Sequence, residues 1–485
     1  MINFSNTYSQ LGDTFYQRIL PTPVSKPEVL FWNEQLAERL NIERSLRNDP
    51  LLKAQYFSGN KMPEGADSIA LAYSGHQFGQ LNPQLGDGRA HLMGEVVTPS
   101  RERFDIQLKG SGPTSFSRQG DGRCALGPAI REYIMSEAMY SLGVPTTRCL
   151  AVVTTGEPVY REGVRPGAVV TRVAASHIRV GTFQYFSIRN DMESLQALLD
   201  YTVARHFPEI DPNSEDRAIQ FLEAAIAKQI RVVVEWMRIG FIHGVMNTDN
   251  TAISGETIDY GPCAMMGIYN PNTVYSSIDR QGRYAFGNQP GIAMWNMARL
   301  AECLLPLIDS DEKKAIAAAE PVLMQFGPQF EAANLQMLAN KFGITDNTLL
   351  DKALIDTFLQ KMMEQQLDYT QTFIDLRRSL DDDAIGNELA SALGESYLGW
   401  RKLIGDSKQG IELSKKLMIE TNPIVIPRNH HVEAVLKSCE ETGCASAAED
   451  FLCVLKSPYK ELSTTKNYQD LPVDNDRHYK TFCGT

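Results

Sequence analysis

The sequence lacks any apolar run close to the roughly 18 residues that a membrane-spanning helix needs. The chain begins MINFSNTYSQLGDTF, without the basic and apolar regions of a secretory signal peptide. Basic side chains are the minority, because 47 Lys and Arg stand against 59 Asp and Glu, a formal net charge of −12. A protein of this charge is a poor general binder of nucleic acid or of anionic membranes. We therefore expect a cytoplasmic protein without a nucleic-acid or membrane partner.

Cysteine pairs at metal-ligand spacing are also absent. The eight cysteines include no CxxC motif, which excludes a zinc ribbon and a dense disulfide framework. Most of them are expected to be small buried side chains. Cys483 differs, because it lies near the end of a polar tail where burial is not expected.

The 485 residues change in pattern along the chain, without an internal repeat or a low-complexity linker. A Gly-rich region of short β-like runs with one helix is followed by a long region of helical periodicity. The predicted parts are an N-terminal extension packing on the core, a β-rich N-lobe, a helical C-lobe and a C-terminal extension with the near-terminal Cys: 1–65, 66–185, 186–430 and 431–485. This α+β layout is that of a protein-kinase fold, although composition alone does not distinguish it from other α+β arrangements.

Capping signals and apolar spacing locate the helices. In the β-rich region a helix is predicted over 128–143, opened by Pro128 and closed by Gly143. Residues 214–240 have apolar side chains at helical spacing for nearly their full length. Further helices are predicted near 29–40, 291–307, 311–326, 347–377, 383–402 and 409–419.

Lys109 ends a predicted strand, IQLKGSG, and Glu132 lies on the helix that follows. A lysine held by an acid can anchor phosphate oxygens, and this strand–helix pair is the kinase arrangement. The alternative is a solvated lysine and a surface glutamate. From these two residues alone the alternative is favoured.

Two GDG sequences, at 86–88 and 120–122, surround this strand in the sequence. The first precedes Arg89, so Gly86, Gly88 and Arg89 could bring backbone N–H groups and a guanidinium against a phosphate or ribose. The second, inside SRQGDGR, provides another such place. A GDG alone is more often a hairpin turn.

Arg172 and Arg179 are seven residues apart and flank a stretch of small residues. Two surface arginines are the usual interpretation. If both side chains turn inward, they join Lys109 as three positive charges that can hold a terminal phosphate deep in a cleft.

Oxygen ligands are concentrated in HGVMNTDNTAISGETIDYGPC, residues 243–263. Asn250 and Asp259 are suited to Mg²⁺ or Mn²⁺ held against phosphates, which leaves Asp249 to accept a proton from an incoming hydroxyl. The stretch is also good turn chemistry, and taken alone the two interpretations are evenly balanced. With Lys109 and Glu132 in the kinase order, the site interpretation is favoured.

Long strings in this sequence resemble the selenoprotein O (SelO, YdiU-type) family of pseudokinases. They cover nearly the whole chain and include FSNTYSQLGDTFYQRILPTPVSKPEVLFWNEQLAERL, YSGHQFGQLNPQLGDGRAHLMGEV, DIQLKGSGPTSFSRQGDGR, HGVMNTDN, TIDYGP and NPIVIPRNHHVEAV. The resemblance implies a kinase-like fold that binds ATP in a flipped orientation. It implies transfer of AMP to Ser, Thr or Tyr hydroxyls of proteins, and bacterial members of the family also use UTP with Mn²⁺.

The resemblance also implies a role for each site residue. Asp249 is the implied proton acceptor, Asn250 a metal ligand and Asp259 a metal and nucleotide contact, with Glu132 the salt-bridge partner of Lys109. The other implied nucleotide contacts are Gly86, Gly88, Arg89, Lys109, Asp121, Gly122, Arg172 and Arg179.

The segment after DYGP departs from the family. Cys263 follows where relatives usually carry an aromatic residue, and Tyr275 aligns with the activation-segment cysteine of some bacterial relatives. Cys483 keeps the near-terminal position of the family's cysteine. Because Tyr275 replaces its usual partner, redox control by a disulfide would need Cys263 as the partner of Cys483. Ordinary phosphoryl transfer and a non-catalytic nucleotide-binding scaffold are the alternatives to AMP transfer. The set Lys109, Glu132, Asp249, Asn250 and Asp259 weighs against the scaffold.

Overall fold

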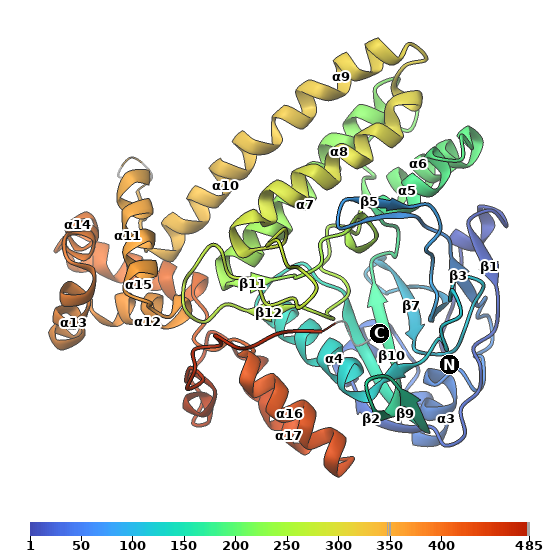
Figure 1. Ribbon diagram of the computed structural model, residues 1–485, viewed down its shortest axis with the longest axis horizontal. Helices are drawn as coiled ribbons and strands as arrows, with labels where there is room; N and C mark the ends of the chain where they lie inside the picture. The colour runs from blue at the N-terminus through green and yellow to red at the C-terminus, as the bar shows by residue number, and fades with distance from the viewer. Residues whose placement is uncertain (347, 349–350, 483–485) are drawn as a thin grey trace.

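The computed structural model of the protein describes residues 1–346, 348 and 351–482 (Figure 1). It is a mixed α/β structure in which one antiparallel sheet meets a large set of helices. The sheet order is β1-β3-β6-β7-β10-β9-β2, and the short β8 pairs with β10. The strands are β1 (Tyr16–Arg18), β2 (Glu28–Trp32), β3 (Ile69–Leu71), β6 (Ala90–Val97), β7 (Arg103–Lys109), β8 (Cys124–Ala125), β9 (Arg148–Tyr160) and β10 (Val164–Ala174).

Both faces of this sheet are covered by helices, which explains why its central strands are apolar on both sides. On one face Leu36 and Phe57 pack with Ile106 and Val153 in a core of their own. The helices on that face are α1 (Glu34–Arg39), α2 (Arg44–Arg47) and α3 (Pro50–Phe57). On the other face lies α4 (Leu126–Ser141), which is buried along almost its whole length.

The helix predicted over 128–143 is therefore confirmed, two residues earlier than expected. It ends at Ser141 with Leu142 as its C-cap, and Gly143 follows with φ +81°, a conformation that favours glycine. The long helix predicted over 214–240 is also confirmed as α7 (Arg217–Ile239), which ends at Gly240 with φ +76°.

In the helical part of the molecule α8, α9 and α10 pack on α7, α11 to α15 extend away from the sheet, and α16 and α17 pack on α4 (Figure 1). Besides α7, its helices are α5 (Val180–Ser187), α6 (Met192–His206), α8 (Gln289–Ile308), α9 (Glu312–Met324), α10 (Phe326–Lys341), α11 (Lys352–Glu364), α12 (Tyr369–Arg378), α13 (Asp383–Leu393), α14 (Glu395–Ile404), α15 (Lys408–Thr421), α16 (Asn429–Thr442) and α17 (Ser446–Leu455). Two small two-stranded sheets are also present: the hairpin of β4 (Gly75–Gln77) with β5 (Gln80–Asn82), and β11 (Phe241–Ile242) paired with β12 (Ala264–Met265).

Three predicted helices differ from the structure. The first half of 29–40 is strand β2, because its β-branched and aromatic residues pair with β9, and Asn33 then caps α1 through the N–H of Leu36. The helix predicted over 347–377 is two helices, α11 and α12, divided where Gln366 takes φ +53°; residues 347 and 349–350 lie outside the described part. The helix over 383–402 is divided at Gly394, φ +57°, into α13 and α14.

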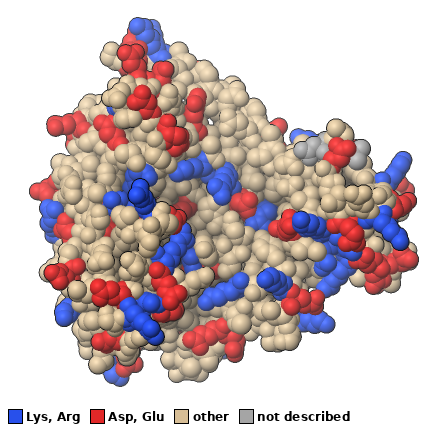
Figure 2. Space-filling view, turned by 180° about the vertical axis from the view of Figure 1, so that it is seen from behind, with Lys and Arg blue, Asp and Glu red and all other residues tan. Residues whose placement is uncertain are grey.

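No helix in the part of the chain that the structure describes combines the length and the apolar character needed to span a membrane. On the face shown in Figure 2, Lys and Arg side chains are interspersed with Asp and Glu. This mixed surface agrees with the acidic composition, which disfavours a general polyanion binder.

Candidate functional site

A cavity of about 820 Å³ lies where the sheet meets α4, the start of α5 and the loop after α7. Apart from the two cysteines, every residue predicted for the site lines it. They are Gly86, Gly88, Arg89, Lys109, Asp121, Gly122, Glu132, Arg172, Arg179, Asp249, Asn250 and Asp259. The structure thus brings together residues from separate strands, helices and loops.

Five charged side chains, which we call the cavity cluster, form the inner wall: Lys109, Glu132, Arg172, Arg179 and Asp259. Lys109 Nζ donates to Glu132 Oε2 at 2.7 Å and to Asp259 Oδ1 at 2.8 Å. Arg172 bridges the same two acids, with 2.7 Å from Nε to Glu132 Oε1 and 2.5 Å from Nη2 to Asp259 Oδ1. Arg179 Nη1 lies 3.3 Å from Asp259 Oδ2. Three cations therefore surround two carboxylates, and a third carboxylate, that of Asp87, lies 3.9 Å from Arg179 Nη2.

The strand register explains how this cluster forms. Arg172 is opposite Gln107 and Val170 is opposite Lys109 in the β7–β10 ladder, so Lys109 and Arg172 project from the same face of the sheet. Glu132 reaches them from α4, which packs on that face. The alternative of a solvated lysine and a surface glutamate is wrong, because Glu132 is buried and paired.

Electrostatics keep both acids of the cavity cluster ionised. Burial alone would raise the pKa of Asp259, but Arg172, Lys109 and Arg179 lower it well below its ordinary value. Burial likewise opposes ionisation of Glu132, and Arg172 with Lys109 lowers its pKa. The cluster is therefore a fixed array of charges at neutral pH.

Asp249 is the buried acid beside this cluster that has no cation on its carboxylate. Its Oδ2 accepts a hydrogen bond of 3.3 Å from Gln77 Nε2, and its buried Oδ1 has no partner among the described residues. Burial raises the pKa of Asp249 to about 6, against the partial opposition of Arg179. A carboxylate with a pKa near neutrality and a free oxygen is suited to accept a proton.

The position of Asp249 depends on two glycines and one arginine. A Cβ at Gly75 would lie 2.5 Å from Asp249 Oδ1, and a Cβ at Gly181 would lie 2.1 Å from the carbonyl oxygen of Ser74. Arg179 Nη1 donates 2.5 Å to the backbone carbonyl of Asp249 and thereby joins the loop to the cavity cluster.

Asn250 and Asp259 fit the predicted metal ligands. The Asn250 amide donates to the Val245 carbonyl at 3.1 Å, which leaves its side-chain oxygen for a cation. Asp249, Asn250 and Asp259 line the same cavity. Asp259 has φ +64°, a sparsely populated conformation for a residue other than glycine, and such strain is concentrated at functional sites. This set of hard oxygen donors suits Mg²⁺ or Mn²⁺.

The two GDG loops form one wall of the cavity and are joined to each other. Thr114 Oγ1 donates 2.8 Å to the carbonyl of Asp87, and Ser117 Oγ donates 2.5 Å to that of Gly88. A Cβ at Gly86 would lie 2.4 Å from the Phe116 ring, and one at Gly122 would lie 2.1 Å from the Gly112 backbone. The glycines are therefore required for close packing of the wall as well as for access to its backbone.

Asp121 lies at the rim, and its carboxylate is already paired with Arg161 at 2.8 and 3.0 Å. Arg161 lowers the pKa of Asp121. Its neighbour Gly122 and the more distant Arg89 line the same cavity. Asp121 therefore offers the cavity an ion pair rather than a free carboxylate.

Of the two predicted redox residues, Cys263 is described by the structure and is not among the residues that line the cavity. Cys263 is fully buried, and burial raises its thiol pKa to about 12. Cys483 lies outside the described residues. The described end of the tail reaches the site, since Thr481 donates to the Pro262 carbonyl at 2.7 Å and pairs with the segment at Ser276.

Sequence reasoning missed three residues that organise the site. Asp87, inside the first GDG, accepts from Gln107 at 3.0 Å and from the N–H of Leu71 at 3.2 Å. Tyr73 lies under the Arg179 guanidinium at 4.6 Å, and Gln77 is the hydrogen-bond donor to Asp249. Only Asp87 carried a sequence signal, its place between the two glycines; the other two are brought to the cavity by the β4–β5 region.

The chain is similar to known proteins along most or all of its length. The family model described as "Protein adenylyltransferase SelO" matches residues 1–456. A protein of Teredinibacter turnerae named "Protein nucleotidyltransferase YdiU" is 53% identical over 485 residues, covering 100% of both chains. Proteins of the same name from Pseudoalteromonas translucida and Bacillus mycoides are 49% and 48% identical, covering 100% of this chain and 100% and 98% of theirs. The chain belongs to the SelO family of protein adenylyltransferases.

Proposed function

We propose that this protein transfers AMP from ATP to hydroxyl groups of other proteins and releases pyrophosphate. The observation that carries the proposal is the buried carboxylate of Asp249, which accepts one hydrogen bond from Gln77 and has no cation paired with it among the described residues, beside a cluster of three cations. Neither feature alone is sufficient, since buried ion pairs also occur as structural elements. Family membership supports the same activity.

The proposed architecture is a two-lobe, kinase-like fold. The N-lobe would comprise 66–185 and the helical C-lobe 186–430, with extensions at 1–65 and 431–485. The antiparallel sheet with α4 on one face, followed by the helices around α7, supports this division. The extension 1–65 contributes β1 and β2, which lie at the two ends of the sheet order.

In the proposed complex, Lys109, Arg172 and Arg179 hold the outer phosphates of ATP. These cations lie on the inner wall of the cavity, and Arg172 is almost completely buried. Phosphates held there would place the α-phosphorus nearer to the acceptor than the γ-phosphorus. The backbones of the two GDG loops and Arg89 would contact the remainder of the nucleotide.

Asp249 acts as the general base. The acceptor hydroxyl donates its proton to the Asp249 carboxylate while its oxygen forms a bond to the α-phosphorus. The bond from the α-phosphorus to the bridging oxygen breaks, and the electron pair leaves with pyrophosphate. The cations of the cavity cluster stabilise the charge that develops on the departing oxygens.

Asn250 and Asp259 would hold Mg²⁺ or Mn²⁺. When bound, the metal ion supplies Lewis-acid neutralisation of phosphate charge. The acceptors would be Ser, Thr or Tyr hydroxyls, and UTP would serve as a second nucleotide, with UMP transferred in place of AMP.

A labelling experiment tests the proposal. The protein is incubated with a protein extract and either α-³²P or γ-³²P ATP, with Mg²⁺ or Mn²⁺. We expect protein-bound label from the α-position only, together with release of pyrophosphate. Label from the γ-position would indicate phosphoryl transfer, and binding of ATP without transfer of either label would indicate a scaffold.

A further inference from the structure

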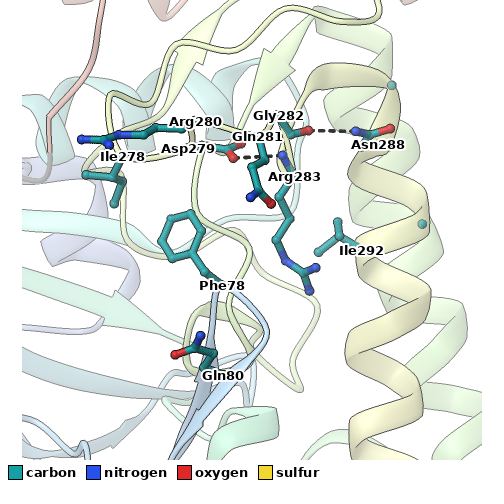
Figure 3. A pocket seen from close by; sticks show the side chains of 12 residues that line it. Phe78, Gln80, Ile278, Asp279, Arg280, Gln281, Gly282, Arg283, Asn288 and Ile292 are labelled. Carbon is teal, nitrogen blue, oxygen red and sulfur yellow. Dashed lines mark hydrogen bonds between the residues drawn. The ribbon is translucent and has the colours of Figure 1, made fainter.

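A second cavity, of about 800 Å³, adjoins the nucleotide cavity (Figure 3). Phe78 and Ile278 line both cavities, so the two are continuous at these side chains. The second cavity lies between the β4–β5 hairpin, the loop at 278–283 and the start of α8. We call it the acceptor groove.

The wall of the acceptor groove is bonded directly to the loop that carries Asp249. The backbone N–H of Phe78 donates to Asn247 Oδ1 at 3.0 Å, and the Tyr284 hydroxyl donates to the same oxygen at 2.7 Å. The Phe78 and Tyr284 rings pack edge to face at 5.2 Å. A peptide bound in the groove would therefore be held in a fixed position relative to Asp249.

The charges of the groove are unbalanced. Among the described residues, neither Arg280 nor Arg283 forms an ion pair, and the Nε of Arg283 is buried without a hydrogen-bond partner. Asp279 is the acid in the lining, but it is buried and its carboxylate accepts the backbone N–H groups of Arg283 and Tyr284. The groove is therefore lined by two arginines and one acid, an excess of one positive charge, in a protein of net charge −12.

The arginines lie on different sides of an apolar surface. Figure 3 shows Arg283 extending between the hairpin and α8, whereas Arg280 lies beside Ile278 on the other side of Phe78. Arg283 is held against the Trp295 ring at 4.9 Å. Phe78 and Ile278 are 37% and 50% exposed, which leaves apolar surface between the two cations for a side chain or backbone of a ligand.

We propose that the acceptor groove binds the segment of the protein substrate that flanks the modified hydroxyl, and that it selects segments with acidic side chains. The inference rests on the proposed function for the identity of the reaction, and on charge complementarity for the identity of the ligand. Arg side chains bind carboxylates through paired, charge-assisted hydrogen bonds. The volume of the groove is in the range of about 300–1,000 Å³ that is typical of ligand sites.

Binding is measured separately from transfer. The probes are fluorescent peptides that contain one Tyr flanked by Glu, by Gln or by Lys, titrated in the presence of α,β-methylene-ATP, which cannot release pyrophosphate. We expect the Glu peptide to bind about tenfold more tightly than the Gln peptide, and the Lys peptide to bind most weakly.

Charge reversal provides the sharpest variant. Arg280 is exposed and its side chain forms no ion pair with the other described residues, so Arg280→Glu should fold normally and should reverse the preference toward the Lys peptide. Arg44→Glu, at an exposed arginine of α2 outside both cavities, is the matched control and should leave the preference unchanged.

Filling the groove provides an independent variant. Gly291 lies in the first turn of α8 and lines the groove, and a Cβ there would meet nothing within 4 Å. Gly291→Leu should weaken binding of every peptide about tenfold without affecting nucleotide affinity. Gly327→Leu, at an equally open position in the first turn of α10, is the control.

The outcomes separate this inference from the proposed function. One outcome is selective peptide binding that depends on Arg280, without transfer of α-³²P label to the same peptides. This result would support the acceptor groove as a binding site and would overturn AMP transfer. Transfer of label to Glu, Gln and Lys peptides alike, with Gly291→Leu equal to wild type, would retain AMP transfer and overturn the groove.

Discussion

Two clusters of buried, ion-paired side chains in this protein have different roles. The cavity cluster joins Lys109, Arg172 and Arg179 to Glu132 and Asp259. A second group, which we call the support cluster, consists of Glu95, Asp105, His177 and Arg205. Arg205 donates to Glu95 at 3.1 Å and to Asp105 at 2.5 Å, and His177 Nδ1 lies 3.0 Å from Asp105. None of these four residues lines the nucleotide cavity.

The two clusters differ in whether the buried acids of the cluster or beside it keep an oxygen without a hydrogen-bond partner. The acids of the support cluster are saturated, since Glu95 also accepts the backbone N–H groups of Thr7 and Tyr8 at 2.7 and 2.6 Å. The support cluster thereby connects the N-terminal segment to the sheet and to α6. The cavity cluster has an open space on one side, and Asp249 beside it keeps an unpartnered oxygen. Buried charge alone does not identify a site; buried charge next to a cavity and an unpartnered acid does.

The largest expected effect is on turnover in Asp249→Asn. The amide preserves the shape but cannot accept the proton, so AMP transfer should fall about 10²–10⁴-fold. Nucleotide affinity should change less than about threefold, because Asp249 is not in the cavity cluster. Single-turnover transfer of α-³²P label and nucleotide titration measure the two quantities. Full turnover in this variant would remove Asp249 from the reaction.

A substitution in the support cluster should lower stability and leave turnover almost unchanged. Asp105→Asn leaves Arg205 and His177 without their shared acid and should reduce the free energy of unfolding by about 3–5 kcal/mol. Transfer per folded molecule should remain close to wild type. Denaturant unfolding and an activity assay normalised to folded protein test this; a loss of transfer without a loss of stability would place the cluster in the catalytic machinery.

Asp249 and Asp105 should affect the pH dependence of stability in opposite directions. The folded pKa of Asp249 is raised to about 6 by burial, so its stabilising protonated form is lost as the pH rises through 6. Asp249→Asn should therefore be more stable than wild type above about pH 6, by about 1–3 kcal/mol, and equal to it below about pH 4.

Asp105 should show the reverse dependence. Burial alone would raise its pKa, but Arg205 and His177 lower it to about 2. Its contribution to stability is present above about pH 4 and is lost as the pH falls toward about 2. Thermal unfolding of wild type and both variants across this range measures the two dependences. Parallel curves for the two variants would contradict the distinction between the clusters.

The smallest effect is expected at the rim of the cavity. The side chain of Asp121 is 46% exposed and is paired with Arg161, an arrangement that contributes about 0–1 kcal/mol. Asp121→Asn should change nucleotide affinity less than about threefold and leave turnover unchanged. A large loss measured by nucleotide titration would mean that this ion pair contacts the nucleotide directly.

Much of the site could be predicted from the sequence because its residues carry local signals. Lys109 ends a strand of clear β pattern, Glu132 lies in a helix predicted to open at a proline, and Asp249, Asn250 and Asp259 lie in a short run of oxygen ligands. The central strands and α7 were also predictable, since their apolar periodicity agrees with their burial. Helix boundaries were harder, because a single residue such as Gln366 or Gly394 divides a continuous apolar pattern.

Other features had no local signal. Residues 29–32 were predicted as helix but form β2, because pairing with β9 outweighs helical amphipathicity. Gln77 and Phe78 carry no motif, yet the β4–β5 hairpin brings one to Asp249 and the other to the junction of two cavities. Only packing between distant segments could reveal these roles.

The sequence by itself determines which side chains are able to bind phosphate, bind a metal ion or accept a proton, since those properties belong to the side chains themselves. Whether a charge is saturated or left open depends on the neighbours that folding supplies. Asp105 and Asp249 are both buried aspartates, but Arg205 and His177 close around the first, and a cavity adjoins the second. Desolvation and ion pairing act over a few ångströms in space, so the pKa and the role of each acid are properties of the tertiary structure.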